Sequence, residues 1–176
     1  MYKIITAHTA RHYARHARPL VSGLVAALLL AASLATPPAL AADGKDYPGS
    51  LCQPRRSTYT FDRGSPGQVF NTSTSNQTWI CPHVHDIDGD YAGVITVIDQ
   101  HFHEDVICTL YSRTREGHLL DESTPRRSAG TSTVPQKLFT EQVEGVANGY
   151  AFLSCPVPGM YNGEASGIVS YEVTDQ

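Results

Sequence analysis

The sequence predicts an all-β domain, a two-sheet sandwich of jelly-roll-like or Ig-like type, preceded by a helical signal peptide. Three observations lead to this expectation. Short runs of β-branched and aromatic residues alternate with turn residues, all four cysteines lie beyond residue 41, and no apolar stripe of helical period follows the N-terminal segment. We divide the 176 residues into a cleavable signal peptide at 1–41, a flexible leader at 42–50 and a disulfide-stapled β domain at 51–176.

The N-terminal segment has the three regions of a secretory signal in the required order. Residues 1–18 contain four basic residues and no acidic one, residues 20–34 are almost entirely apolar, and Ala39-Leu40-Ala41 supplies small residues at the positions that a signal peptidase reads. A membrane-spanning helix needs about 20 apolar residues, more than this run offers. We therefore expect cleavage after Ala41, with cleavage after Ala42 and an uncleaved anchor as alternatives, and export to the periplasm or the extracellular space.

Removing residues 1–41 makes the chain more acidic. Four of the 13 Lys and Arg residues but none of the 17 Asp and Glu residues lie in that segment, so the net charge falls from −4 to −8. An acidic surface disfavours nucleic acid, whose recognition depends on neutralising phosphates. No later stretch is apolar enough to span a membrane. We therefore expect neither a nucleic-acid partner nor a membrane span after cleavage, and nothing in the sequence specifies a partner or an oligomeric state.

An even number of cysteines in an exported chain predicts disulfides. Four cysteines allow three connectivities, and we favour Cys52–Cys81 with Cys108–Cys155 because each bridge then joins neighbours along the chain. A four-cysteine metal site is disfavoured, since no C-x-x-C pair is present and the spacings are wide.

Eight strands are expected from the β pattern. The segment 93–98 is apolar nearly throughout, as a strand buried on both faces should be. Cys108 shares a face with Leu110, and Cys155 shares a face with Leu153, so a bridge between these cysteines would join two inward faces. The expected strands are 57–62, 67–72, 77–81, 92–99, 105–114, 135–141, 149–157 and 167–174.

The most noticeable candidates for chemistry are two His-x-His pairs, His83 with His85 and His101 with His103. On a strand, residues two apart point the same way, so each pair could chelate zinc or copper. The alternative is that these are exposed loop histidines, because the strand at 92–99 would hold the two pairs at opposite ends of the sheet.

The segment Asp86-Ile-Asp88-Gly-Asp90 has the spacing of a calcium loop. It fails the EF-hand pattern, because Tyr91 stands where glycine is required and Val97 stands where the bidentate glutamate is required. An irregular calcium site is one interpretation, and a turn containing Asp88-Gly89 is the other.

Signatures of hydrolases are missing. The sequence contains neither a G-x-S-x-G elbow nor an H-E-x-x-H motif. Asn71 and Asn76 each begin a glycosylation sequon. We expect a turn-rich segment before Trp79, in which the match to the sequon is incidental, rather than glycosylation. Trp79, the only tryptophan, is expected in the core beside Cys81.

The cysteine frame resembles a group of small secreted bacterial proteins that are themselves uncharacterised. The matching elements are Cys-Gln-Pro at 52–54, Phe-Asn-Thr-Ser at 70–73, Cys81-Pro82, Val97-Ile98-Asp99, Asp-Val-Ile-Cys-Thr-Leu at 105–110, Gly-Tyr-Ala-Phe-Leu-Ser-Cys-Pro at 149–156 and Ser-Tyr-Glu-Val at 170–173. The resemblance implies an exported β domain and supplies no catalytic residue.

The leading hypothesis is an exported, non-catalytic β-sandwich module that binds a ligand or associates with the envelope. An exported enzyme of unknown type is the first alternative, and a transition-metal-binding protein that uses the His-x-His pairs is the second. We expect no obligatory cofactor, with zinc, copper or calcium as the metals that these alternatives would need.

Overall fold

The computed structural model describes residues 43–58, 60–63, 67–84 and 89–176. The predicted signal peptide, its cleavage site at Ala41, and His85, Asp86 and Asp88 lie outside the described residues. Within the described part of the chain, no helix has the length and apolar character needed to span a bilayer.

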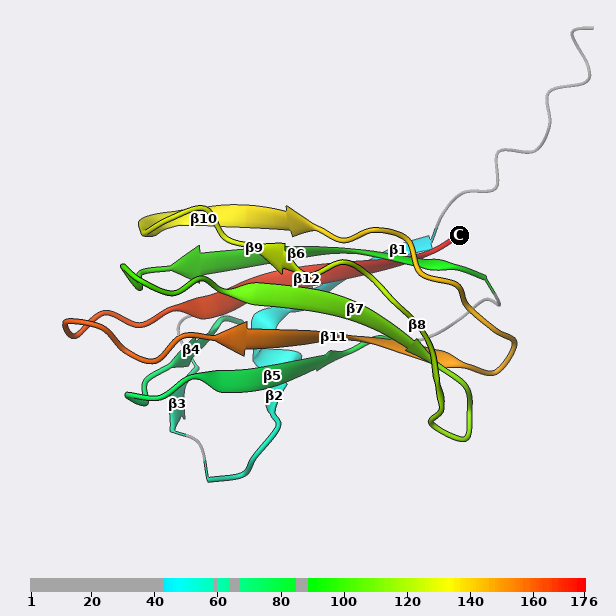
Figure 1. Cartoon of the computed structure of the whole chain (residues 1–176), viewed down its shortest axis with the longest axis horizontal. Helices are drawn as coiled ribbons and strands as arrows, with labels where there is room; N and C mark the ends of the chain where they lie inside the picture. The colour runs from blue at the N-terminus through cyan, green and yellow to red at the C-terminus, as the bar shows by residue number, and fades with distance from the viewer. Residues whose placement is uncertain (1–42, 59, 64–66, 85–88) are drawn as a thin grey trace, which may run out of the picture. The chain divides into compact units, whose positions relative to one another are not determined.

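The β domain consists of two antiparallel sheets, as the sequence predicts (Figure 1). We call them sheet A and sheet B. Sheet A has the order β10 (Ser132–Phe139), β6 (Tyr91–Asp99), β12 (Gly167–Asp175), β4 (Val69–Asn71) and β3 (Phe61–Asp62), with β1 (Asp43–Pro48) also paired to β12. Sheet B has the order β2 (Gln53–Pro54), β5 (Gln77–Pro82), β11 (Tyr150–Val157), β7 (Ile107–Arg113) and β8 (Leu119–Glu122), with β9 (Arg126–Arg127) paired to β7. A short 3₁₀ turn, Gly49–Leu51, joins β1 to β2.

The core forms between the facing sides of the two sheets. Buried and half-buried residues alternate along β5, β6 and β11, which is the period of two that a half-buried strand requires. Trp79 is 1% exposed and packs edge-on against Phe61 with a centroid distance of 5.3 Å, so the expected core position is confirmed. The largest other side chains buried there are Tyr91, Tyr171, Ile95, Leu110, Leu153 and Ile168.

Residues 42–50 are not a flexible leader, because 43–48 form strand β1. Six residues of β1 pair in antiparallel register with β12, from Asp43 opposite Asp175 to Pro48 opposite Ser170. The ring of Tyr47 stacks on Tyr171 with a centroid distance of 5.0 Å. The polar composition suggested a loop, but the free edge of β12 and one aromatic contact are enough to order the segment.

The eight expected strands are all present within a few residues of the expected ends. Four more strands, β1, β2, β8 and β9, were not expected. They are short or lie at sheet edges, where half of the pattern faces solvent and apolar alternation is weak.

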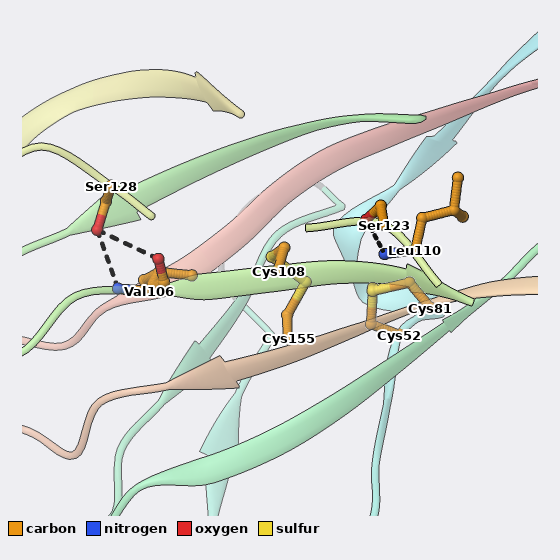
Figure 2. Close-up of a disulfide and its surroundings, with 8 residues drawn as sticks. All are labelled: Cys52, Cys81, Val106, Cys108, Leu110, Ser123, Ser128 and Cys155. Atoms are coloured by element: carbon orange, nitrogen blue, oxygen red, sulfur yellow. Dashed lines mark hydrogen bonds between the residues drawn. A yellow bond between two sulfur atoms is a disulfide. The ribbon is translucent and has the colours of Figure 1, made fainter. Parts of the chain in front are cut away.

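Two disulfides join Cys52 to Cys81 and Cys108 to Cys155, which is the pairing that the sequence favours (Figure 2). The first bridge fastens the end of the 3₁₀ turn to β5. The second joins the neighbouring strands β7 and β11 of sheet B, one position beyond the Thr109–Ser154 pair of their register. All four cysteines are at most 1% exposed, so both bridges form part of the core.

Residues 119–128 follow the outer edge of β7 almost continuously. Between β8 and β9, Ser123 exchanges hydrogen bonds with Leu110: its backbone N–H donates to the Leu110 carbonyl, and its hydroxyl accepts from the Leu110 N–H at 3.0 Å. Ser128 does the same with Val106, and Figure 2 shows the contacts of its hydroxyl with the Val106 N–H and carbonyl groups. The two serine hydroxyls thus replace ladder bonds where the strand is interrupted.

Candidate functional site

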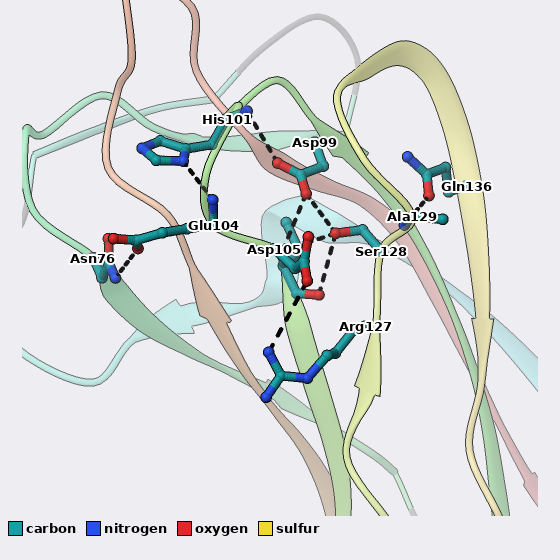
Figure 3. A network of polar contacts seen from close by, with 10 residues as sticks. Asn76, Asp99, His101, Glu104, Asp105, Arg127, Ser128, Ala129 and Gln136 are labelled. Atoms are coloured by element: carbon teal, nitrogen blue, oxygen red, sulfur yellow. Dashed lines mark hydrogen bonds and ion pairs between the residues drawn. The ribbon is translucent and has the colours of Figure 1, made fainter.

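The loop that follows β6 is built around the buried carboxylate of Asp99 (Figure 3). Its Oδ1 accepts hydrogen bonds from the His101 N–H at 3.1 Å and the Ser166 hydroxyl at 3.0 Å. Its Oδ2 accepts from the Val106 N–H and the Ser128 hydroxyl. Four donors from three segments, namely the 100–106 loop, Ser128 and Ser166, satisfy this carboxylate, so Asp99 holds the end of the sandwich together and is not free for chemistry.

The imidazole of His101 closes the same loop. Its Nδ1 accepts hydrogen bonds from the backbone N–H groups of His103, at 3.2 Å, and Glu104, at 2.9 Å. A ring nitrogen that accepts must be unprotonated, so the proton of neutral His101 lies on Nε2. Only Nε2 of His101 therefore remains for a ligand, and the loop uses the other nitrogen.

Tyr161 packs against both histidines of this loop. It stands at the start of a two-residue turn in which Asn162 and Gly163 both have positive φ, and the Tyr161 and Glu164 backbones exchange two hydrogen bonds. The Tyr161 ring centroid lies 5.0 Å from that of His101 and 5.5 Å from that of His103. The two imidazole centroids are 6.4 Å apart, with the planes at 69°. The second His-x-His pair is thus an aromatic cluster with Tyr161.

An open depression of about 220 Å³ lies beside this loop. Its ionisable lining comprises His103, Glu104, Asp105 and Arg127, and the remaining lining is Asn76, Ile107, Pro156, Val157 and Pro158. Three of these groups contact a neighbouring side chain: the Asn76 amide donates to the Glu104 carboxylate, and Arg127 Nη1 lies 4.0 Å from Asp105 Oδ2. Figure 3 shows both contacts: Asn76, which precedes β5, with Glu104, and Asp105, which precedes β7, with Arg127 of β9.

His83, the described member of the first His-x-His pair, is separated from the second pair by the whole length of β6. His83 follows β5 and lies with Asp175, opposite the start of β6, whereas His101 follows the end of β6. His85 lies outside the described residues. Within the ranges that the structure describes, no three His, Cys, Asp or Glu side chains are grouped so that they could hold a metal ion. The structure therefore does not bring His83, His101 and His103 together, and metal binding by these residues stays a prediction.

Only Gly89 and Asp90 of the calcium-like segment are described, and the Asp90 side chain is held by the fold. Its Oδ1 accepts from the Gly145 N–H at 3.1 Å, and its Oδ2 accepts from the Gln142 amide at 3.0 Å. The carboxylate thus anchors the 141–145 segment to the start of β6.

Asn71, the first sequon asparagine, is fully buried. Its side-chain amide donates to the carbonyl oxygens of Ser75, Val157 and Pro158 at 2.8–3.1 Å, and its Oδ1 accepts from Ser73. All of its hydrogen-bonding capacity is used inside the fold, so Asn71 is a structural residue.

A second candidate surface lies on the outer face of sheet B, and we call it the aromatic face. Its members are Tyr111 and Arg113 of β7 and Tyr150 and Phe152 of β11, which alternate with buried residues along each strand. The Phe152 ring centroid lies 5.3 Å from Tyr111 and 6.3 Å from Tyr150, with interplanar angles of 15° and 27°. Three nearly parallel rings therefore stand side by side on two neighbouring strands.

The cation of Arg113 completes this face. Its guanidinium carbon lies 5.7 Å from the centroid of Phe152, and its Nη1 donates to the Gly117 carbonyl at 2.6 Å. The register places Arg113 opposite Tyr150 and Tyr111 opposite Phe152, so strand pairing fixes the spacing of all four side chains.

Our reading of the sequence missed the aromatic face, although a signal was present. In Tyr150-Ala151-Phe152-Leu153 and in Leu110-Tyr111, aromatic residues occupy the positions that alternate with core residues. Several large aromatic side chains grouped on the outward side of neighbouring strands indicate a candidate interaction surface.

No protein-family model matches the sequence, and no characterised protein matches it by sequence comparison. The resemblance to small secreted bacterial proteins therefore stays a prediction.

Several solved β-domains overlap with the chain. One is the CBM36-1 domain of a multidomain xylanase from the hindgut metagenome of Trinervitermes trinervoides, with a TM-score of 0.48, 9% identity, and coverage of 76% of this chain and 98% of that chain. Another is the C-terminal CBM6 of LamC, a marine laminarinase from Zobellia galactanivorans, with a TM-score of 0.47, 11% identity, and coverage of 76% and 100%. The Cry4Aa toxin of Bacillus thuringiensis overlaps equally well, with a TM-score of 0.47, 12% identity, and coverage of 76% and 23%. Overlaps of this quality assign no ligand or activity to the chain.

Proposed function

We propose that the protein is an exported, non-catalytic module that binds carbohydrate through the aromatic face. The observation that carries the proposal is the set of three nearly parallel rings, Tyr111, Phe152 and Tyr150, on the outward side of two neighbouring strands.

The aromatic face is preorganised. The Tyr111–Phe152 pair belongs to the hydrogen-bonded register of β7 and β11, and the second disulfide joins the same two strands. Arg113 is held between the Phe152 ring and the Gly117 carbonyl. Rings that are already ordered lose little conformational freedom when a ligand binds, and this favours affinity from a small contact area.

The neighbours of the rings favour a carbohydrate over an apolar partner. Ser154 of β11 and Thr78 of β5 are half-buried and lie on the same side of sheet B as the rings, because they alternate with the core residues of their strands. Sugar rings present C–H faces that stack on aromatic rings, and hydroxyl groups that need hydrogen-bonding partners. A face that combines rings with hydroxyls matches both requirements.

Under the enzyme alternative, the depression beside the His101 loop would be the active site. It is open to solvent, and Glu104 and Asp105 each contact a neighbouring side chain of the protein. Catalytic groups need convergence on a substrate atom in an enclosed, water-poor site. We therefore favour binding without chemistry.

Export is supported by the two disulfides, which form and persist in oxidising compartments. With the signal features of residues 1–41, they favour the periplasm or the extracellular space as the place where the protein works.

The test is affinity electrophoresis of the disulfide-bonded protein in gels that contain plant, algal or bacterial polysaccharides. We expect retardation by at least one of them. The double variant Tyr150→Ala/Phe152→Ala should weaken that binding about fivefold or more, because two ring contacts worth about 0.5–1.5 kcal/mol each are lost. The matched control is Phe102→Ala, which removes a ring that is 70% exposed on the His101 loop and should leave the retardation unchanged.

Unchanged retardation of the double variant would overturn the role of the aromatic face, as would the absence of retardation in every gel. Release of soluble sugars from the retarding polysaccharide would favour the enzyme alternative. In that case His103→Ala, beside the depression, should abolish the release.

A further inference from the structure

A groove with cationic walls runs between β9 and β10. It has a volume of about 330 Å³ and is lined by Arg126, Arg127, Lys137, Leu138 and Phe139. Strand β9 lies on the edge of sheet B beside β7, and β10 is the edge strand of sheet A. The groove therefore lies along one open side of the sandwich, where the edges of the two sheets approach each other.

The groove concentrates positive charge on an acidic protein. Its lining contains three of the nine basic residues that follow residue 41, and it contains no carboxylate. Lys137 forms no ion pair within the described part of the chain. Arg127 has a loose contact with Asp105, at 4.0 Å, and its side chain is 63% exposed. Two cations are thus available to a ligand from opposite walls.

The third cation is held in place. Arg126 Nη2 lies 2.9 Å from Glu141 Oε1, and the hydroxyl of Thr124 donates to the other oxygen of that carboxylate at 2.7 Å. The Nε atom of Arg126 is buried, while 43% of the side chain stays exposed. The ion pair with Glu141 therefore holds the Arg126 side chain in place, and its guanidinium group stays partly exposed beside the groove.

The groove also has an apolar side. Phe139 of β10 is 61% exposed, although its strand neighbour Leu138 is buried in the core. A ligand that fills this groove combines an anionic group with an apolar face. An acidic sugar ring has both features, since its carboxylate or sulfate can pair with the guanidinium and ammonium groups while its C–H face contacts Phe139.

We propose that this groove binds the oxyanion group of an acidic polysaccharide, with Arg127 and Lys137 as its cationic contacts and Phe139 as its stacking surface. The site is separate from the aromatic face, and it does not depend on the function proposed for that face.

A polysaccharide fits better than nucleic acid. Duplex DNA carries one negative charge per ~1.7 Å of helix axis, and its binding requires a broad basic surface. The chain beyond residue 41 has nine basic and 17 acidic residues, so only a local patch is positive. A polymer with at most one or two charges on each sugar ring can place one anion in the groove without bringing many others close to the acidic surface.

The experiment measures binding by isothermal titration at low and at physiological salt. The probes are polygalacturonate, which carries carboxylates, dextran sulfate, which carries sulfates, unmodified dextran and a short DNA duplex. We expect binding to at least one of the two acidic polysaccharides, weaker binding at higher salt, and no binding to dextran. The preferred acidic probe identifies the carboxylate or the sulfate as the natural anion.

Arg127→Gln/Lys137→Gln should weaken the binding by at least about tenfold, because two charge-assisted contacts are lost. The matched control is Arg55→Gln/Arg56→Gln, which removes the same charge from the other arginine doublet, where both residues are exposed. It should change the dissociation constant by less than about twofold. The doublet follows β2, at the opposite edge of sheet B from β9, and exposed charges separated by more than a Debye length are largely screened at physiological salt.

Equal weakening by the two double variants would overturn the proposal, because it would indicate diffuse attraction. Tighter binding of DNA than of either polysaccharide, or no binding of any polyanion, would overturn it as well. The Tyr150→Ala/Phe152→Ala variant should bind the acidic probe normally, so failure of the groove and failure of the aromatic face are distinguishable.

Discussion

Nε2 of His83 lies 2.7 Å from Oδ1 of Asp175, and both side chains are completely buried. The two residues are 92 positions apart: His83 follows β5 of sheet B, and Asp175 ends β12 of sheet A. The rings of Tyr47 and Tyr91 stand edge-on to the imidazole, with centroid distances of 6.2 and 5.9 Å. The pair therefore joins the two sheets at the end of the sandwich where the C-terminal strand finishes.

We expect His83→Leu to lower the free energy of unfolding by about 3–5 kcal/mol, since it removes the imidazole contact of a buried carboxylate. The double variant His83→Leu/Asp175→Asn should lose less stability than the sum of the losses in the two single variants, because the contact between the two side chains is then lost only once. Urea unfolding of all four proteins measures the coupling. A coupling energy below about 0.5 kcal/mol would show that the pair does not contribute as a unit.

Asp99 performs the corresponding role at the other end of β6. Asp99→Asn replaces an acceptor-only carboxylate by an amide whose nitrogen must face donors, so at least one of the four hydrogen bonds becomes a repulsive contact. We expect a loss of about 2–4 kcal/mol in the free energy of unfolding. Asp62→Asn, an exposed position on β3, is the matched control and should change stability by less than about 0.5 kcal/mol.

The two disulfides should differ little in their effect on stability. They close loops with sequence separations of 29 and 47 residues. The chain-entropy relation then gives stabilisation of about 3.5 and 4 kcal/mol, respectively. Thermal unfolding of the paired variants Cys52→Ser/Cys81→Ser and Cys108→Ser/Cys155→Ser checks this expectation. An effect confined to one bridge would contradict it and would indicate that the other closes a loop already ordered in the unfolded chain.

The fold class could be predicted because the interior of the sandwich obeys a simple period. Ile95 and Val97 on β6, or Leu153 and Cys155 on β11, alternate with outward residues over enough positions to mark a strand. Strand β1 has no such pattern. Its order comes from the unpaired edge of β12, which becomes visible only when the order of the strands is known.

The candidate sites were harder to predict, for a different physical reason. Neighbouring histidines suggested chelation, but His101 uses its Nδ1 within its own loop, and His83 is paired with a residue 92 positions away. The aromatic face combines β7 and β11, which are distant in the sequence. The cationic groove lies between β9 and β10, which are consecutive along the chain but belong to different sheets. Arg127 and Lys137 meet only because β9 and β10 end up on the same side of the sandwich.

Glu141 beside the cationic groove has a pKa that is lowered from 4.5. The largest cause is the hydrogen bond from the Thr124 hydroxyl, followed by the bond from the Thr124 N–H. Desolvation raises the pKa by less than these bonds lower it, and the attraction of Arg126, which also lowers it, is the smallest contribution. A carboxylate with a lowered pKa keeps its stabilising contacts above the ordinary value and loses them as the pH falls through the lowered one. We therefore expect Thr124→Val to raise the midpoint of the Glu141 carboxyl titration, followed by NMR, more than Arg126→Gln does. A larger rise in Arg126→Gln would mean that the ion pair dominates, in which case Arg126 would be less available to an anion in the groove.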